Sequence, residues 1–181
     1  AVEQVEADSI LLLTNDKNVI PAADQAAELV ISNIVILPTE TQAEGLECIV
    51  DFDPYESAFK NKEMMVNLIP LIKTITIFNS SRAVEMNGQK VDHMQPIAMI
   101  NGELYGYAEN LDDLFVKVVE EEVKKSVEHI TVLLGNGLTN EDVPRLEKLL
   151  KTNLPDLSED IIEVHVGDQP HYDYLISVLQ N

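Results

Sequence analysis

The sequence predicts an α/β protein in which a parallel βαβ unit is followed by a mixed sheet with two hairpins and covering helices. Two short apolar runs, residues 9–14 and 33–39, flank a segment of helical periodicity. The order strand, helix, strand indicates two parallel strands joined by a crossover. Two Asn-Gly pairs then stand between apolar runs, and Asn-Gly is the strongest short-range hairpin signal because both residues need positive φ.

The first part of the chain, residues 1–52, matches one half of an open α/β sheet. Asn15 or Asp16 is suited to cap the first helix, and Pro21 lies near its first turn, where proline is tolerated. The runs at 9–14 and 33–39 are typical of strands buried on both faces. A loop and a short helix containing Gly45 follow the second strand.

The second part, residues 53–181, is predicted to be a mixed lobe, although one continuous domain stays open as an alternative. A helix is expected from Tyr55 to about Ile69, where Pro70 ends it. Strands are expected at 74–78, 129–134, 161–166 and 174–179, and hairpins at Asn87-Gly88 and Asn101-Gly102. Asn110 is expected to cap a helix whose apolar face comprises Leu111, Leu114, Phe115, Val118, Val119 and Val127. Thr139 with Asp142 approximates a capping box.

Composition excludes several classes of protein. The 181 residues are 45% hydrophobic, which suffices for a core, and the formal net charge of −20 makes nucleic acid a poor partner. No apolar run reaches the roughly 18 residues of a transmembrane segment. The single Cys48 fits a reducing, cytoplasmic location. The chain opens with Ala1 in a segment that reads as the end of a helix, so we expect it to be a piece of a longer protein.

Polar side chains follow the first two predicted strands, at the edge where open α/β sheets bind ligands. Asn15, Lys17 and Asn18 follow the first strand, and Thr39 and Thr41 follow the second. Helix capping is the simpler interpretation of both loops, and a small polar ligand is the alternative. The first loop lacks the glycines of a dinucleotide or phosphate-binding fingerprint, so it is not interpreted as a nucleotide site.

Other polar clusters favour structural roles. Residues 165–174 read as a structural turn or a partner-facing loop, and His165, Asp168 and His171 offer a metal site as the alternative. Asp51 and Asp53 suit either a cation or the entrance to a helix, and Gly135-Asn136-Gly137 reads as a tight turn. Arg82 beside the hairpins is either a contact residue or a surface charge. No catalytic constellation is present by composition and motif, and no metal site is predicted.

The motifs resemble the C-terminal domain of the fatty acid kinase A subunit. This family is also described as dihydroxyacetone-kinase-like or YloV-like, and the resemblance covers essentially the whole chain. Its most specific parts are Asn15-x-Lys17-Asn18, Gln25-Ala26-Ala27, Pro38-Thr39-x-Thr41, Gly45 and Gln169-Pro170-x-Tyr172. The last turn has Asp168 where the family pattern has glycine, and aspartate tolerates the left-handed conformation at modest cost.

The resemblance implies a DegV-like fold and a bacterial role in phospholipid synthesis. An absent N-terminal kinase domain would hold ATP and magnesium, whereas this fragment would hold no cofactor. The implied partner is a separate DegV-like protein that carries a fatty acid and presents it for phosphorylation to acyl phosphate. A homodimer of the parent protein is left open.

We therefore expect a non-catalytic domain that engages the lipid-carrying partner. The alternative is a small-molecule-binding or phosphatase-like domain, with a pocket between the two strand-end loops and the turn at 169–172. The residues predicted to form the ligand or partner edge are Asn15, Lys17, Asn18, Thr39, Thr41, Arg82, Gln169, Pro170 and Tyr172.

Overall fold

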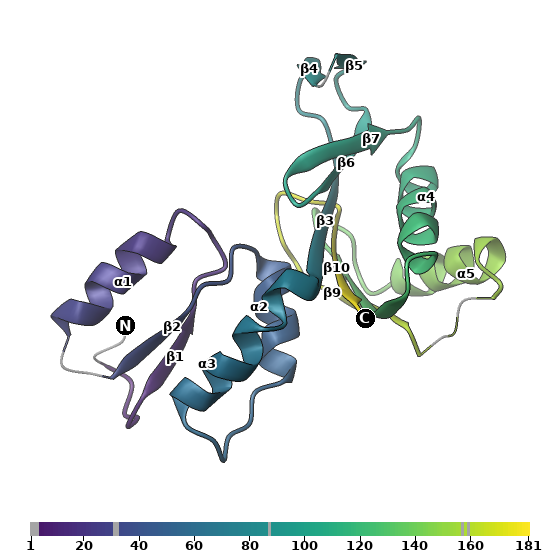
Figure 1. Cartoon of the computed structure of the whole chain (residues 1–181). Coiled ribbons are helices and arrows are strands. Elements are labelled where there is room, and N and C mark those ends of the chain that lie inside the picture. The colour runs from purple at the N-terminus through teal and green to yellow at the C-terminus, as the bar shows by residue number, and fades with distance from the viewer. Residues whose placement is uncertain (1–3, 31–32, 87, 157, 159) are drawn as a thin grey trace. The chain divides into compact units, whose positions relative to one another are not determined.

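The structure, a computed structural model, describes residues 4–30, 33–86, 88–156, 158 and 160–181. It divides into two compact units, unit 1 (Ala1–Ile72) and unit 2 (Lys73–Asn181), which are described separately (Figure 1). The predicted boundary near residue 52 falls inside unit 1. Among the described helices, none has the length and apolar character needed to cross a bilayer.

Unit 1 contains the predicted βαβ motif. Strands β1 (Ile10–Leu13) and β2 (Ile34–Leu37) pair in parallel, with Ile10 opposite Ile34, and α1 (Ile20–Leu29) connects them. Helices α2 (Gln42–Val50) and α3 (Ala58–Val66) and the 3₁₀ helix η2 (Ile69–Leu71) complete the unit.

Two expectations for unit 1 are wrong in detail. Strand β1 is half-buried along its whole length rather than buried on both faces, because each strand of a two-stranded sheet is an edge. The helix expected from Tyr55 to Ile69 is instead α3, which begins at Ala58, where the Ser57 hydroxyl accepts a hydrogen bond from the Lys60 amide. The 3₁₀ helix η2 takes up Pro70, which cannot donate an amide hydrogen bond.

Unit 2 is a six-stranded mixed sheet in the order β7-β6-β3-β10-β8-β9. Strands β8 and β9 are parallel, whereas β3 with β6, β6 with β7, and β8 with β10 are antiparallel. Its elements are β3 (Ile72–Asn79), β4 (Val84–Met86), β5 (Gln89–Val91), β6 (Pro96–Ile100), β7 (Glu103–Tyr107), α4 (Leu111–Val123), β8 (Val127–Leu134), α5 (Val143–Asn153), β9 (Ile162–Val166) and β10 (Tyr174–Gln180).

Both predicted hairpins are present. Asn101 and Gly102 have φ of 49° and 81° between β6 and β7, as the Asn-Gly turn requires. Strands β4 and β5 form the other hairpin; Asn87 itself lies outside the described residues, and Gly88 has φ of 74°.

Of the two helix caps predicted in unit 2, one is present and the other is not. Asn110 caps α4 by accepting the Asp113 amide at 2.8 Å. Asp142 accepts from the Thr139 amide at 2.9 Å, but this pair closes the turn before α5 rather than capping its first residues. Val127, expected on the helix, lies in β8 because α4 ends at Val123.

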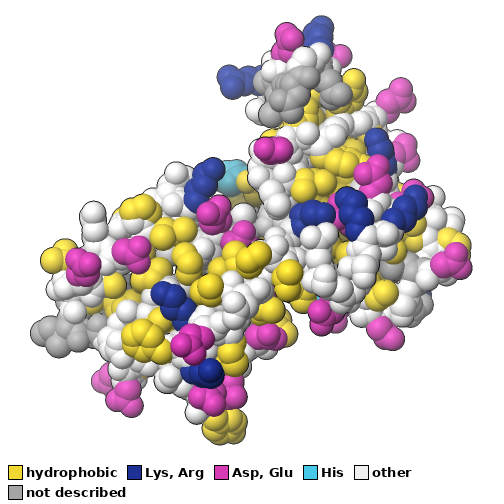
Figure 2. All heavy atoms as spheres, viewed as in Figure 1, with side chains coloured by type: hydrophobic (Ala, Val, Ile, Leu, Met, Phe, Trp, Pro, Cys, Tyr) yellow, Lys and Arg dark blue, Asp and Glu magenta, His cyan; other side chains and the backbone are white. Residues whose placement is uncertain are grey.

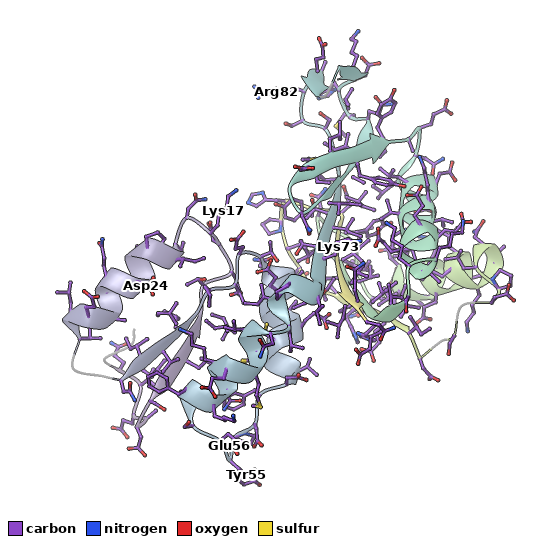
Figure 3. All side chains as sticks on the ribbon, in the orientation of Figure 1. Lys17, Asp24, Tyr55, Glu56, Lys73 and Arg82 are labelled. Atoms are coloured by element: carbon purple, nitrogen blue, oxygen red, sulfur yellow. The ribbon has the colours of Figure 1, made fainter. Side chains whose placement is uncertain are left out.

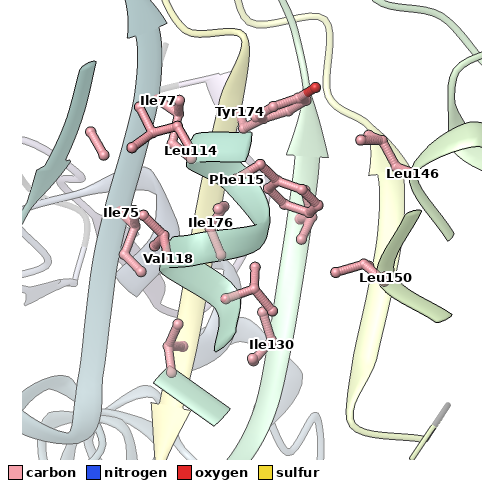
Figure 4. Packing of buried hydrophobic residues seen from close by; sticks show 14 of the residues in the cluster. Ile75, Ile77, Leu114, Phe115, Val118, Ile130, Leu146, Leu150, Tyr174 and Ile176 are labelled. Carbon is pink, nitrogen blue, oxygen red and sulfur yellow. The ribbon is translucent and has the colours of Figure 1, made fainter. Parts of the chain in front are cut away.

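The core of unit 2 lies between the sheet and α4 with α5 (Figure 4). Phe115 on α4 is fully buried, and its ring centroid lies 4.9 Å from that of Tyr174 on β10. Further fully buried contributors are Ile75, Ile77, Leu114, Val118, Ile130, Leu134, Leu146 and Ile176.

Glu122 is a buried charge at the end of α4. Its carboxylate accepts from Lys73 Nζ at 2.5 Å and from Lys125 Nζ at 2.7 Å. Burial opposes ionisation, but the hydrogen bonds from Lys125 and Lys73 outweigh it and hold the pKa of Glu122 below its ordinary value. Because Lys73 begins unit 2, this pair fixes the start of β3 to α4.

Truncation of Phe115 tests the core assignment. Phe115→Ala should lower the free energy of unfolding by about 3–5 kcal/mol, because it removes a fully buried ring and leaves a cavity. Chemical denaturation measures the loss, and Lys148→Ala, exposed on α5, is the control with an expected change within about 0.5 kcal/mol. Equal effects of the two variants would contradict this core.

The Glu122 pair predicts a specific acid dependence of stability. A carboxyl whose folded-state pKa is lowered contributes stability that is present above its unfolded-state pKa and is lost as pH falls through the folded-state pKa. Glu122→Gln should therefore destabilise the protein at neutral pH and flatten this acid limb. Denaturation midpoints measured from pH 7 downward check it, with the exposed Glu128→Gln as control. An unchanged acid limb in Glu122→Gln would refute the role of the pair.

Candidate functional site

The strand-end loops of unit 1 are hydrogen-bonded to each other. The Thr39 hydroxyl donates to Asn15 Oδ1 at 2.8 Å and accepts from the Asn15 amide at 3.0 Å. The Thr14 hydroxyl donates to the Thr39 carbonyl at 2.7 Å. Thr39 is fully buried. Of the residues predicted at this edge, Asn15 and Thr39 are therefore in contact, and they bond each other.

Asn15 packs against α2 as well as against Thr39. A Cβ added at Gly45 on α2 would lie 2.1 Å from Asn15 Oδ1, so only glycine admits the amide here. Asn15 has φ of 53°, which asparagine tolerates better than most residues. Thr41 accepts from the Glu44 amide at 3.1 Å, which confirms Thr41 as the cap of α2.

The capping role expected of Asn15 or Asp16 is wrong. Helix α1 begins at Ile20, and the preceding Val19 makes no side-chain cap. Asp16 instead accepts hydrogen bonds from the backbone amide and the side chain of Asn18, at 2.8 and 3.0 Å. These bonds lie within the loop, before α1 begins. Asn15 is unavailable as a cap because its side chain is engaged by Thr39.

Lys17 is the exposed cation of this loop (Figure 3). Within the described part of the chain, its ammonium has no ion pair or hydrogen bond. Asn18 beside it is also exposed, although its side chain bonds Asp16. Of the predicted edge residues in unit 1, Lys17 is thus the one that presents an unused charge to solvent.

In unit 2 the turn after β9 is built around Gln169. Its side-chain Nε2 donates to the Leu133 carbonyl at 2.8 Å, and its own carbonyl accepts from the Asn136 amide at 2.8 Å. Two glycines make room, since a Cβ at Gly135 or at Gly167 would lie 2.3 Å from Gln169 oxygen atoms. Asp168 has φ of 54°, which confirms that aspartate takes the left-handed position in this turn.

Asp173 joins the same edge of the sheet. Its carboxylate accepts from Asn136 Nδ2 at 3.0 Å and from the Asn79 amide at 3.2 Å. Its backbone amide donates to the Ile77 carbonyl at 2.9 Å, and its carbonyl accepts from the Gly135 amide at 3.0 Å. Asp173 and Asn136 were not among the predicted site residues, although both lie beside strand ends in the sequence.

The other predicted residues of unit 2 do not gather with Gln169 into one polar site. Tyr172 is half-buried and packs its ring against Phe78, with centroids 5.6 Å apart. Pro170 is exposed. Arg82 is an exposed residue on the segment leading to β4 (Figure 3), and its carbonyl accepts from the Ser80 hydroxyl.

The alternative catalytic and metal interpretations find no support among the described residues. No group of three or more potential His, Cys, Asp or Glu ligands converges there. Asp53 accepts from the Tyr55 amide at 2.8 Å, as the entrance to a helix predicts. Burial, with nearby carboxylates, raises the pKa of the Cys48 thiol to about 11, so it is a weak nucleophile.

An exposed apolar surface on unit 1 was not predicted from the sequence. We call it the α2–α3 surface, and it comprises Leu46, Ile49, Val50, Phe52, Tyr55, Phe59 and Val66. Val50, Tyr55 and Phe59 are 80%, 95% and 63% exposed. Figure 2 shows hydrophobic side chains and dark blue cations interspersed on this part of unit 1.

An apolar groove adjoins the α2–α3 surface within unit 1. It has a volume of about 250 Å³ and is lined by Leu11 and Leu13 of β1, Ile49, Phe52 and Met65. A depression along α3 is lined by Phe59, Lys60, Lys62 and Val66, among others. Ile49 and Phe52 thus share the groove, and Phe59 and Val66 share the depression. Exposed apolar side chains beside hollows of this kind are typical of interaction sites.

Comparison with known sequences assigns a family. A family model for FakA-like C-terminal domains, those that resemble the C-terminal part of the fatty acid kinase A subunit, matches residues 1–179. Protein YloV of Bacillus subtilis is 28% identical over 177 residues, which are 98% of this chain and 32% of that protein. An uncharacterized protein of Staphylococcus aureus strain USA300 is 23% identical over 177 residues, with the same coverage. The chain thus spans about a third of the length of these relatives.

Comparison with solved structures shows a DegV-like fold. A DegV family protein from Corynebacterium glutamicum has a TM-score of 0.68 at 18% identity, covering 99% of this chain and 77% of that one. The Streptococcus pneumoniae fatty acid kinase B3 protein, loaded with linoleic acid, has a TM-score of 0.61 at 13% identity, covering 97% and 72%. A Thermotoga maritima protein described as revealing a fatty-acid-binding function has a TM-score of 0.59 at 17% identity, covering 99% and 72%.

The contact between Asn15 and Gly45 predicts that the effect of Gly45→Ala on the free energy of unfolding depends on the residue at position 15. Gly45→Ala should lower the free energy of unfolding by about 1–3 kcal/mol, because the added methyl displaces the Asn15 amide from Thr39. In an Asn15→Gly background the same change should instead stabilise, by up to about 1 kcal/mol, because alanine is the better helix former. Chemical denaturation of the four proteins provides the cycle. The same effect of Gly45→Ala in both backgrounds would contradict the contact.

Proposed function

The chain belongs to the family of FakA-like C-terminal domains, which resemble part of the fatty acid kinase A subunit, and from this membership we propose that it is a non-catalytic docking domain for a fatty-acid-carrying DegV-like protein. The kinase chemistry belongs, in this proposal, to other parts of the parent protein, which would hold ATP and magnesium. This chain would position the partner so that its fatty acid is phosphorylated to acyl phosphate.

The α2–α3 surface is the observation that carries the proposal. It exposes apolar side chains that cost free energy in water, and the adjoining groove can receive one or two apolar side chains of a partner. Lys60 and Lys62 lie on α3 and are two of the three cations between residues 1 and 72. Lys60 pairs with Glu63 on the same helix at 3.3 Å, so Lys62 is the cation of α3 that we assign to an acidic residue of the partner.

Lys17 and Arg82 stay predicted contact residues of the same docking function. Both are exposed cations in a chain of formal net charge −20, so each can pair with an acidic side chain of the partner. The remaining predicted edge residues fit a supporting role better. Asn15, Thr39 and Gln169 are engaged in hydrogen bonds within their own units, and the bonds of Asn15 and Thr39 hold the loop that carries Lys17.

The alternative, a small-molecule or phosphatase-like site at the strand ends, has less support. The Thr39 hydroxyl and Asn15, which would have to bind the ligand, are hydrogen-bonded to each other, with Thr39 buried and Asn15 half-buried. A hydrolase would also need a nucleophile or a metal, and the described residues offer no cluster of metal ligands. The proposal accordingly expects that this chain neither hydrolyses MgATP nor turns over acyl substrates.

Calorimetric titration with the lipid-loaded DegV-like protein from the same source tests the proposal. We expect saturable binding, weakened at least about tenfold by Phe59→Asp because a charge would be buried in the interface. Leu29→Asp on α1 is the matched control, since Leu29 is an exposed apolar residue, 86% exposed, outside the α2–α3 surface. It should leave the affinity unchanged.

Two outcomes of the titration would count against the proposal in different ways. Absence of binding by the unmodified chain at high concentration would reject the docking function. Binding that Phe59→Asp leaves intact would retain docking but reject the α2–α3 surface as its site.

A further inference from the structure

Strand β9 is one edge of the six-stranded sheet of unit 2, with β8 as its neighbour. Ile130 donates its amide to the Ile161 carbonyl at 2.7 Å, and Gly167 donates to the Leu134 carbonyl at 2.8 Å. In a parallel ladder of this register, alternate residues bond the neighbouring strand. The amides and carbonyls of Ile162, Val164 and Val166 therefore point to the open edge.

The two edges of this sheet differ in their protection against pairing. Strand β7, at the opposite edge, contains Gly106, and its pairing with β6 shifts register between Ala98 and Met99. Irregular pairing of this kind discourages the addition of a further strand. Strand β9 pairs with β8 without a shift. It also has no proline, glycine or lysine, and three of its five residues are β-branched and apolar.

The sequence of β9 is self-complementary about Val164. If two copies met antiparallel with a two-fold axis at Val164, Ile162 would face Val166 of the second copy. Glu163 would likewise face His165 of the second copy. These Glu and His positions fall between the hydrogen-bonded pairs, where opposing side chains approach most closely.

Glu163 and His165 are already placed for this exchange. Their side chains lie on the same face of β9, 57% and 58% exposed, and His165 Nε2 is 3.0 Å from Glu163 Oε2. That hydrogen bond lowers the pKa of Glu163, so the carboxylate is ionised at neutral pH. His129 on the neighbouring strand β8 also approaches Glu163, with Nε2 4.0 Å from Glu163 Oε1. In a paired edge each carboxylate would gain a third imidazole, His165 of the second copy.

The opposite face of β9 offers apolar cover. Ile162 and Val164, with Leu150 and Leu154 on and after α5, line a hollow of about 210 Å³ that is open to solvent. A second copy would bring its own Ile162 and Val164 alongside the same hollow and bury more of it. Both faces of the strand thus favour the same occupant.

From these features we propose that β9 pairs antiparallel with β9 of a second copy of this chain, with the two-fold axis at Val164, so that one sheet continues across both copies. The short strand implies a reversible dimer rather than an obligate one. This self-association is independent of the proposed docking function, because it uses unit 2 and needs no lipid-carrying partner.

Sedimentation velocity of the whole chain, from low to high micromolar protein, tests the dimer. The unmodified chain should shift from monomer to dimer. His165→Glu alone and Glu163→His alone should each weaken association by about tenfold or more, because like groups then face each other. The double variant Glu163→His with His165→Glu should restore it, since each carboxylate again faces an imidazole.

A backbone variant gives a second, independent measurement. Val164→Pro removes an amide that points to the open edge and should abolish the dimer, whereas Val164→Ala trims the same side chain and should keep more of the association. Circular dichroism and thermal unfolding establish that each variant is folded. A monomeric unmodified chain, folded single variants that dimerise like it, or a folded double variant that stays monomeric would each overturn the proposal.

Discussion

Both units depend on one constraint, that the polar side chains at their strand ends must find partners once they are buried. In unit 1 the Thr39 hydroxyl and the Asn15 amide bind each other, and in unit 2 Gln169 bonds the Leu133 carbonyl while Asp173 gathers Asn79 and Asn136. Unpaired, these groups would be costly in the interior. The need to pair them explains why glycine stands at 45 and 135, where a side chain would collide with bonded groups of Asn15 and Gln169. Gly167 instead makes room for Gln169 Oε1, which has no hydrogen-bond partner among the described residues.

Much of the fold could be predicted because its signals are local. The Asn101-Gly102 turn, the Asn110 cap and the apolar runs of β1 and β2 each depend on a few neighbouring residues. The role of Asn15 could not be predicted in this way. A residue 24 positions away, Thr39, competes for the amide that helix capping would have used. Long-range partners of this kind override local preference without leaving a pattern in the sequence.

In the candidate site too, local patterns identified some residues, whereas roles that depend on long-range contacts were not predicted. Sequence motifs found Asn15, Thr39 and Gln169, but assigned them to a ligand or partner edge, whereas they make buried or part-buried hydrogen bonds within their own units. Asp173 and the α2–α3 surface were missed for opposite reasons. Asp173 matters because of contacts with distant strands, and the apolar residues of α2 and α3 matter because the described residues of unit 1 leave them uncovered, which periodicity alone does not reveal.

Hydrogen–deuterium exchange of the chain, alone and with the lipid-loaded DegV-like protein, measures the central claim most directly, because it reports on every segment at once. If the strand ends are closed and the partner docks on the α2–α3 surface, protection should increase in peptides from α2 and α3. The amides of residues 14–16, 39–41 and 167–170 should change little. Protection gained at those strand-end loops, with none over α2 and α3, would contradict the account and favour a ligand or partner site at the strand ends.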